Sequence, residues 1–431
     1  MSGETSGGLD DYLRECREAA RRRLRERVTA IARLIRTPLA DVLRDHALVH
    51  LPPAAAARLR LVHPSWARAL ASPLFAVAHA AAPRRLSGFF VPSADGGFLP
   101  LDGADTVPSP SLSFVPASSA VTVLSSSHGL ACCFSPADDA YFVCNPATGA
   151  WAAVPSPPRR AWPRPAVVVL FDAGVYNFRG DYTLVCAFES VPGSGTYCFA
   201  VFTSGAGAWW VADAVVPAEG LVPASGVAAG GTAWWRTSIG TAVGYNPVTG
   251  RVELALCPGD SGEWEIGAAA GTLHCAVQAD DNVVVFRLDE HGCWDMAARV
   301  AVAEILQPRQ PEPAPVRTDD GGEEHREGAV VAVTGAFQTW LPVPEVRLLA
   351  FQGAGVEVVV LAGRRVVAFD TATRRRREVA VPRQPGSGSG WDASEYAAHT
   401  NTLALVAPTV LAREPAVTEP LPDDREVPSS S

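Results

Sequence analysis

Three segments of this chain repeat one strand–turn–strand design, and this repetition limits the possible folds more than any other feature. Residues 141–151, 243–252 and 367–375 each contain a β-branched or aromatic run, a turn that begins with Asn or Asp, and a second run. The Asn or Asp side chain can cap its own turn, and a glycine in two of the turns supplies a positive φ at little cost. Each segment therefore predicts a β-hairpin.

Two further hairpins have the same form without Asn-Pro, with glycines at 205 and 292, and a glycine also precedes several strands, as at 129, 231 and 271. The five turns are centred on Thr148, Ala206, Thr249, His291 and Thr373. The middle intervals fit propeller blades of roughly 40 to 50 residues, and the wider ones indicate insertions or a missed blade.

We therefore predict that residues 85–412 form a β-propeller of about six blades, in which residues 398–406 supply a strand that closes the ring. A β-sandwich is the alternative. Two stretches poor in apolar residues, 307–328 and 413–431, are predicted to be a disordered loop and a disordered tail.

The first 80 residues have helical instead of strand periodicity. Apolar positions recur every three or four residues from Leu13 to Ile35, which predicts an amphipathic helix within residues 1–36. A second helical stretch follows Pro38 and ends at Leu51-Pro52-Pro53, and Pro64 divides the third into two short helices. The fold class is thus mainly β with a small α-helical module at the N-terminus.

The helical stretch of residues 37–80 has more apolar side chains than so short a module can cover by itself. Some of them must contact either a partner protein or the β domain that follows, and the periodicity alone leaves both possibilities open.

Residues 41–53, 58–66 and 72–75 together resemble an F-box. The shared features are the Leu51-Pro52 pair, the Arg-Leu-Val segment that ends at Val62, the tryptophan at 66 and the Pro-x-Phe ending at Phe75. His63-Pro64 stands where the family usually has Cys or Ser followed by a basic residue. The β region is similar to the F-box-associated, kelch-like domains of plant proteins.

This resemblance implies a substrate-recognition subunit of a Skp–cullin–F-box ubiquitin ligase. The F-box would bind the Skp adaptor of the cullin complex, and the propeller would hold an unknown protein substrate. The residues implied in adaptor docking are Leu43, Leu51, Pro52, Leu59, Val62, Trp66, Leu70 and Phe75. In the pairs Trp209-Trp210 and Trp234-Trp235, strand alternation would expose one ring each, so Trp210 and Trp235 are candidate substrate contacts.

Composition narrows the partners. All 36 basic residues are arginine, since the sequence contains no lysine, and the formal net charge is −9, which argues against nucleic acid as a partner. The nine cysteines form no CxxC pair and are interpreted as reduced thiols. No apolar run is long enough to span a membrane, so we expect a cytoplasmic or nuclear protein.

The common catalytic and nucleotide-binding motifs are not found in the sequence, and the nine histidines are scattered, so we expect no cofactor, no metal and no catalysis by this chain. Residues 374–377, a run of four arginines, are interpreted as a solvated hairpin turn.

Two alternatives to the ligase subunit are a propeller enzyme such as a hydrolase or oxidase, and a propeller scaffold that works without any ligase. A cluster of carboxylates or histidines at the axial mouth would favour the enzyme.

Overall fold

The computed structural model describes residues 46–91, 97–101, 112–158, 165–174, 176–259, 263–307, 346–382 and 393–409, together with six helical residues between 18 and 29. Apart from those six residues, the predicted N-terminal helix lies outside the described part of the chain. So do Leu43, the predicted disordered loop beyond Gln307 and the predicted disordered tail.

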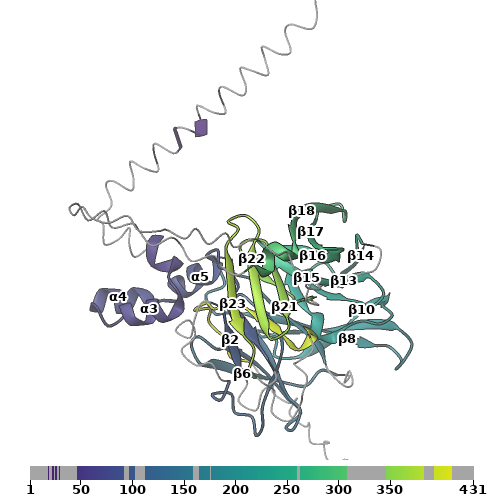
Figure 1. The fold of residues 1–431 in the computed structure, drawn as a ribbon. Coiled ribbons are helices and arrows are strands. Elements are labelled where there is room, and N and C mark those ends of the chain that lie inside the picture. Colours follow the sequence, from purple (N-terminus) through teal and green to yellow (C-terminus); the bar gives the residue numbers. More distant parts are fainter. Residues whose placement is uncertain are drawn as a thin grey trace, which may run out of the picture.

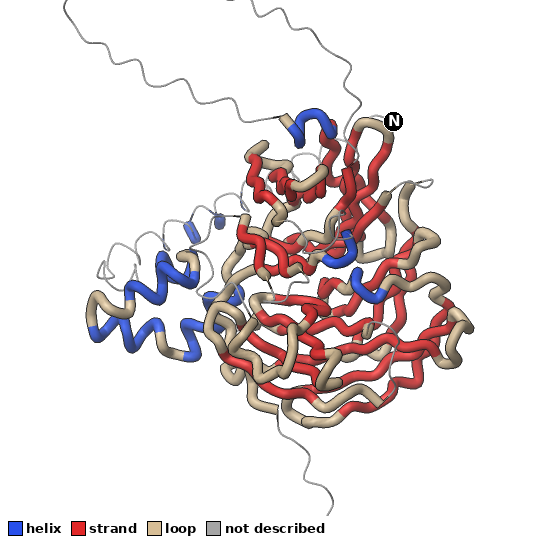
Figure 2. The backbone as a smooth tube through the Cα atoms, turned by 60° about the horizontal axis from the view of Figure 1, so that its bottom comes forward, coloured by secondary structure: helices blue, strands red, loops and turns tan. Residues whose placement is uncertain are grey.

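The fold is mainly β, a six-bladed propeller with a few short helices near the N-terminus, and Figures 1 and 2 show these helices grouped on one side of the propeller. The expectation of about six blades is thus confirmed, and the sandwich alternative is wrong. The helical segments are η2 (Leu48–His50), α3 (Pro53–Leu59), α4 (Pro64–Leu70) and α5 (Pro73–Ala81).

Five blades are built from consecutive antiparallel strands. The first contains β3 (Thr122–Ser127), β4 (Leu130–Ser135), β5 (Ala140–Asn145) and β6 (Ala150–Val154). The second contains β7 (Ala166–Phe171), β8 (Tyr182–Glu189), β9 (Thr196–Thr203) and β10 (Trp209–Pro217). The third contains β11 (Val227–Ala229), β12 (Thr232–Arg236), β13 (Thr241–Asn246) and β14 (Arg251–Leu256), preceded by η4 (Pro223–Ser225).

The fourth blade contains β15 (Trp264–Ala269), β16 (Thr272–Ala279), β17 (Asn282–Leu288) and β18 (Trp294–Ala301), followed by α6 (Val302–Leu306). The fifth contains β19 (Val346–Leu348), β21 (Glu357–Ala362), β22 (Arg365–Asp370) and β23 (Arg376–Ala380). Between them, β20 (Gln352–Gly353) pairs in parallel with β15 and so connects these two blades.

The closing blade combines strands from both ends of the β region. Here β1 (Gly88–Phe90) lies between β2 (Phe98–Pro100) and β24 (Ala397–His399), which follows η5 (Ala393–Glu395). Phe89, for example, is opposite Leu99 on one side and Ala398 on the other. A C-terminal strand therefore closes the ring, as predicted, but it spans residues 397–399 instead of 398–406.

The hydrophobic core of the propeller is divided among the contacts between neighbouring blades. Separate clusters join the first and second blades, the second and third, the third and fourth, and the closing and first, while the largest cluster joins the last three. Because a strand inside a blade has another blade on each side, both of its faces are buried, as in β21, where all six residues are buried.

The predicted turn chemistry is found where the sequence places it. The side-chain Oδ1 of Asn145, Asn246 and Asp370 accepts hydrogen bonds from backbone N–H groups two or three residues later, at 2.9 to 3.0 Å. Gly149 and Gly250 have φ of 70° and 69°, and Arg374 takes the same left-handed conformation at 56°. All of these turns connect the third and fourth strands of a blade.

The eight described cysteines are free thiols, and five of them are buried. Cys198 and Cys257 are half-buried and Cys293 is exposed. The interpretation of the cysteines as small hydrophobic residues therefore fits those on the inner strands of the blades and does not fit Cys293.

Candidate functional site

The helical module, residues 46–81, has helix boundaries set by proline. Each of its three α-helices begins with proline at the first position, where the missing N–H and fixed φ are tolerated. His63 caps α4 by accepting the backbone N–H of Ser65 at 3.1 Å, and the Ser72 hydroxyl caps α5 by accepting that of Phe75 at 3.2 Å. The predicted division at Pro64 into two short helices is confirmed.

A small core holds these helices together. It consists of Leu48, Val49, Ala56, Leu70 and Phe75, with Leu51, Leu59, Trp66 and Leu403 packed against it. Most of the residues implied in adaptor docking therefore stabilise the module itself: Leu70 and Phe75 are buried, and Leu51, Leu59 and Trp66 are partly buried. Pro52 and Val62 are exposed, and Leu43 lies outside the described residues.

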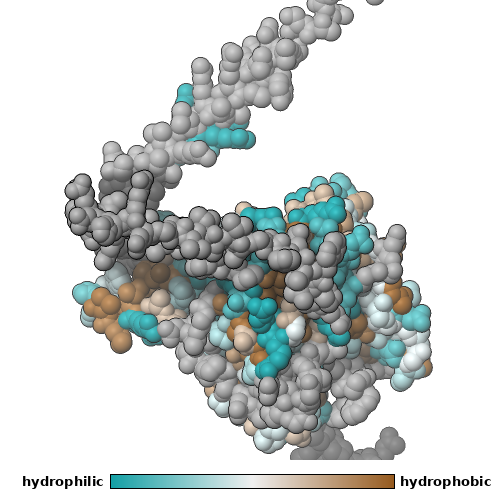
Figure 3. All heavy atoms as spheres, viewed as in Figure 1, coloured by the Kyte–Doolittle hydropathy of each residue, from teal (hydrophilic) through white to brown (hydrophobic). Residues whose placement is uncertain are grey.

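Three large apolar side chains of the module point into solvent. Leu61 is 89% exposed, Val62 64% and Leu74 66%. Figure 3 shows hydrophobic residues gathered at the far end of the module, around α3 and α4. Leu61 and Leu74 were not among the residues chosen from sequence. The exposure of Leu74 could be predicted from the sequence, because adjacent residues in a helix lie on different faces and Phe75 is on the buried face.

Polar contacts join this module to the propeller. His79 is fully buried; its Nδ1 accepts the backbone N–H of Leu403 at 3.1 Å, and its Nε2 therefore donates to the Leu51 carbonyl at 3.1 Å. The Arg84 guanidinium donates to the carbonyls of Val49, His50, Leu51 and His79. These two side chains gather the carbonyls around the end of η2 and fix them against the propeller.

The segment that follows β24 binds both parts of the protein. Asn145 Nδ2 donates to the carbonyls of Thr402 and Ala404, at 3.1 and 2.7 Å, and the Thr402 hydroxyl donates to the His128 carbonyl at 2.6 Å. At Gly129, which has φ +92°, an added Cβ would lie 2.2 Å from the Thr402 hydroxyl, so only glycine fits there. The same segment supplies Leu403 to the core of the helical module.

We expect acid to weaken the fold through two buried histidines, His79 and His399. Burial and the nearby Arg84 lower the pKa of His79 to about 3, and burial lowers the pKa of His399 in β24 to about 4. Each imidazole is neutral when folded and binds a proton when unfolded, so its stabilisation is complete above pH 6.5 and is lost as the pH falls towards those values. Each should change the free energy of unfolding by up to about 1.4 kcal/mol per pH unit in that window.

Urea unfolding at several values between pH 7 and 5 measures this slope. A His79→Gln variant, which keeps an uncharged donor and acceptor, should have the shallower pH dependence. Equal slopes for the variant and the wild type would contradict the assignment.

A cavity of about 410 Å³ lies between the end of α5 and the axial mouth of the propeller. Its lining consists mostly of alanine and glycine, with Arg84, Ser127, His128, Gln352, Thr400 and Thr402 as the polar residues. Among the described residues that line it there is one histidine and no carboxylate, so the cluster that the enzyme alternative requires is not found there. The Thr400 hydroxyl is buried and has no hydrogen-bond partner.

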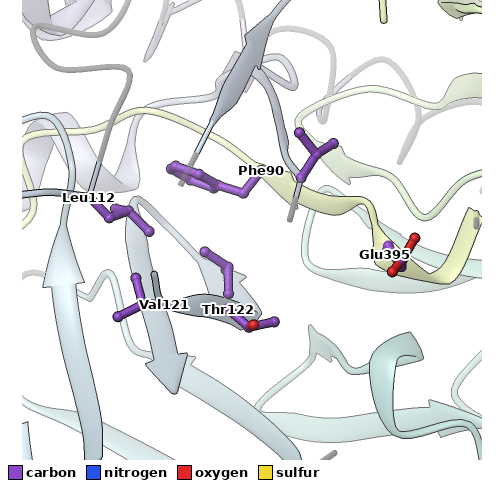
Figure 4. A pocket seen from close by; sticks show the side chains of 7 residues that line it. Phe90, Leu112, Val121, Thr122 and Glu395 are labelled. Atoms are coloured by element: carbon purple, nitrogen blue, oxygen red, sulfur yellow. The ribbon is translucent and has the colours of Figure 1, made fainter. Parts of the chain in front are cut away.

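Two further hollows of the propeller are small. One of about 20 Å³ is lined by residues of four blades, including Leu124, Gly226, Phe351 and Tyr396. Figure 4 shows another, of about 10 Å³, where Phe90, Leu112, Val121, Thr122 and Glu395 meet between the closing and first blades. Neither holds more than about one water molecule.

Two expectations about the propeller surface are wrong, the second of them in part. Trp235, a candidate substrate contact, is fully buried and Trp234 nearly so, because β12 is covered by a blade on each face. Trp210 on the outer strand β10 is partly exposed, in agreement with strand alternation. The arginine run is only in part a solvated turn: Arg374 and Arg375 are exposed at the hairpin turn, but Arg377 makes a buried ion pair with Glu357 and Arg376 is also largely covered.

Comparison with known proteins adds no family. No known protein family matches the chain, and no curated protein sequence does so. Similar solved structures include virginiamycin B lyase from Staphylococcus aureus, with 11% identity and a TM-score of 0.32 over 62% of this chain and 70% of that one. AztD from Citrobacter koseri has 10% identity and a TM-score of 0.30 over 66% and 76%. YCF48 bound to D1 peptide has 10% identity and a TM-score of 0.34 over 69% and 83%.

Within the described part of the chain, no group of three or more side chains is arranged to hold a metal ion. No helix found there is long and apolar enough to cross a membrane.

Proposed function

We propose that this protein is a substrate-recognition subunit of a Skp–cullin–F-box ubiquitin ligase in the cytoplasm or nucleus. The observation that carries the proposal is the exposed apolar set Leu61, Val62 and Leu74 on a helical module that already has its own core. Large apolar side chains on a small folded module mark an interaction surface, because their burial by a partner is favourable.

The contacts between the helical module and the propeller favour a module that binds a partner over one that only caps the β domain. The module contacts the propeller through His79, Arg84 and Leu403, and the three exposed residues take no part in those contacts. The apolar residues are therefore left for a second protein. The mouth cavity, lined mostly by alanine and glycine and without a carboxylate among its described lining residues, gives no matching support to the hydrolase or oxidase alternative.

Capture by the Skp adaptor tests the proposal. The full chain should be retained by immobilised adaptor, and a double variant, Leu61→Asp with Val62→Asp, should bind at least about a hundredfold more weakly, because buried unpaired charge disrupts a docking centre. Both positions are exposed, so the variant should keep the wild-type melting temperature. Replacing Leu51 or Trp66 would be a poorer test, because both pack on the module's core.

Val248→Asp is the matched control. Val248 is 90% exposed in the turn between β13 and β14 and should not affect adaptor binding. Failure of the wild-type chain to bind the adaptor would overturn the proposal and leave the ligase-independent scaffold as the better description.

A further inference from the structure

A groove of about 710 Å³ runs between the third and fourth blades. It starts at the axial mouth, where Gly271 lines both the groove and the mouth cavity, and reaches the turns at Asn246 and Gly292. The mouth cavity is also lined by Ala80 and Arg84, so the groove opens on the face of the propeller that carries the helical module.

Small residues between these two blades explain the groove. The cluster that joins them is the smallest in the propeller, and four of its nine buried residues are alanine. Its members Trp234, Ala255, Leu273 and Leu288 also line the groove and give it an apolar floor. The blades are held together nonetheless by the Arg236–Glu265 ion pair, at 2.9 Å.

The groove walls are charged. The lining has three carboxylates, those of Glu253, Asp289 and Glu290, and one guanidinium, that of Arg251. His291 is the remaining titratable group, and its Nε2 lies 3.7 Å from Glu290 Oε1. The Asp289 carboxylate accepts the backbone N–H groups of Cys293 and His291, at 2.7 and 2.9 Å, and these bonds keep its pKa below the usual value. The walls therefore carry excess negative charge at neutral pH.

A long groove with an apolar floor and acidic walls matches an extended chain that alternates apolar and basic side chains. The strand β14 forms one wall and is the last strand of its sheet among the described residues. Its six residues would lie beside about 20 Å of extended peptide, since a strand rises about 3.3 Å per residue. Leu254, exposed on this strand, adds apolar surface at the groove's edge.

We propose that this groove binds an extended, basic segment of a partner protein. The inference rests on the proposed function, since it gives the chemical class of the substrate segment and places it on the face next to the helical module. Apolar contacts with the floor would supply affinity, and the acidic walls would select arginine or lysine over glutamate.

Binding of two labelled peptides to the full chain, without the adaptor, tests this directly. One fluorescein-labelled peptide alternates arginine and valine over ten residues, and the matched peptide has glutamate in place of arginine. Fluorescence anisotropy should show binding of the basic peptide that weakens as salt is added, and at least about tenfold weaker binding of the acidic one.

Two variants locate the site. The double variant Glu253→Arg with Glu290→Arg should lower the affinity for the basic peptide at least about tenfold, because it reverses the charge of the groove walls. Gly271→Asn should do so by narrowing the passage: Gly271 has φ +77°, which asparagine tolerates, and an added Cβ there meets no atom within 4 Å. Gly149→Asn is the matched control, at φ +70° with the same open space, in the first blade.

Equal affinity of the basic peptide for the wild type and both groove variants would overturn the inference, as would equal or tighter binding of the acidic peptide. Capture by the Skp adaptor does not depend on the groove, so loss of peptide binding with adaptor binding intact would reject the groove alone.

Discussion

When this chain is assembled into an active ligase with its N-terminal amine acetylated, we expect no ubiquitin to be attached to it. Ubiquitin is normally transferred to a lysine ε-amine, and none of the 431 residues is lysine. The N-terminal amine is then the remaining ordinary acceptor. The same chain with a free N-terminus should be modified at that one position.

Three exposed arginines of the helical module allow the converse experiment. Arg58, Arg60 and Arg68 are exposed, so Arg→Lys at these positions should leave stability within about 0.5 kcal/mol of the wild type. The acetylated triple variant should acquire ubiquitin, and mass spectrometry of the digested product would locate it.

Adding Leu61→Asp and Val62→Asp to that variant should abolish the modification if adaptor docking brings the chain to the conjugating enzyme. Ubiquitin on the acetylated wild-type chain would contradict the prediction, because without an acceptor amine it would have to be attached through a hydroxyl or thiol side chain. Equal modification of the acetylated wild type and the triple-lysine variant would show that missing lysines give no protection.

Arg377→Ala is expected to lower the free energy of unfolding by about 3–5 kcal/mol, because it leaves a carboxylate buried without its counter-charge. Both guanidinium-to-carboxylate distances from Arg377 Nη2 to Glu357 are 2.7 Å, and Arg377 Nη1 also donates to the Leu86 carbonyl at 2.7 Å. These bonds tie the fifth blade to the chain that leads into β1. Burial raises the pKa of Glu357 even though Arg377 opposes this, so the carboxylate depends on its partner.

The midpoint of urea denaturation measures this loss. Arg377→Met combined with Glu357→Leu should recover most of the stability, because an apolar pair of similar volume removes the buried charge together with its partner. If Arg377→Ala alone unfolds at the same urea concentration as the wild type, water reaches Glu357 and the pair is not buried in solution.

Local chemistry could be read from the sequence because each signal depends on residues close together in the chain. The Asn and Asp turn caps, the turn glycines and the prolines that begin α3, α4 and α5 all act within a few residues. These signals were sufficient to predict hairpins of a regular design, a blade period and a divided third helix. The five hairpins correspond to the first five blades, while the closing blade of β1, β2 and β24 contains none of them.

The candidate site was predicted less well. Sequence resemblance singled out Leu70 and Phe75, which the module uses for its own core, and did not include Leu61 or Leu74, which are exposed. Helical periodicity shows which residues share a face, but it does not show which face the neighbouring helices cover. The groove had no sequence signal either, because its walls come from hairpins about 40 residues apart.

By itself, the sequence determined the class of the fold, the position of its turns and the absence of lysine. Tertiary structure alone decided that Trp235 is buried on both sides, that Arg377 forms an ion pair beneath the surface, and that His79 and Arg84 join the helices to the propeller. The reason is physical: burial in a propeller depends on the next blade, and the partner that covers a residue lies far away in the chain.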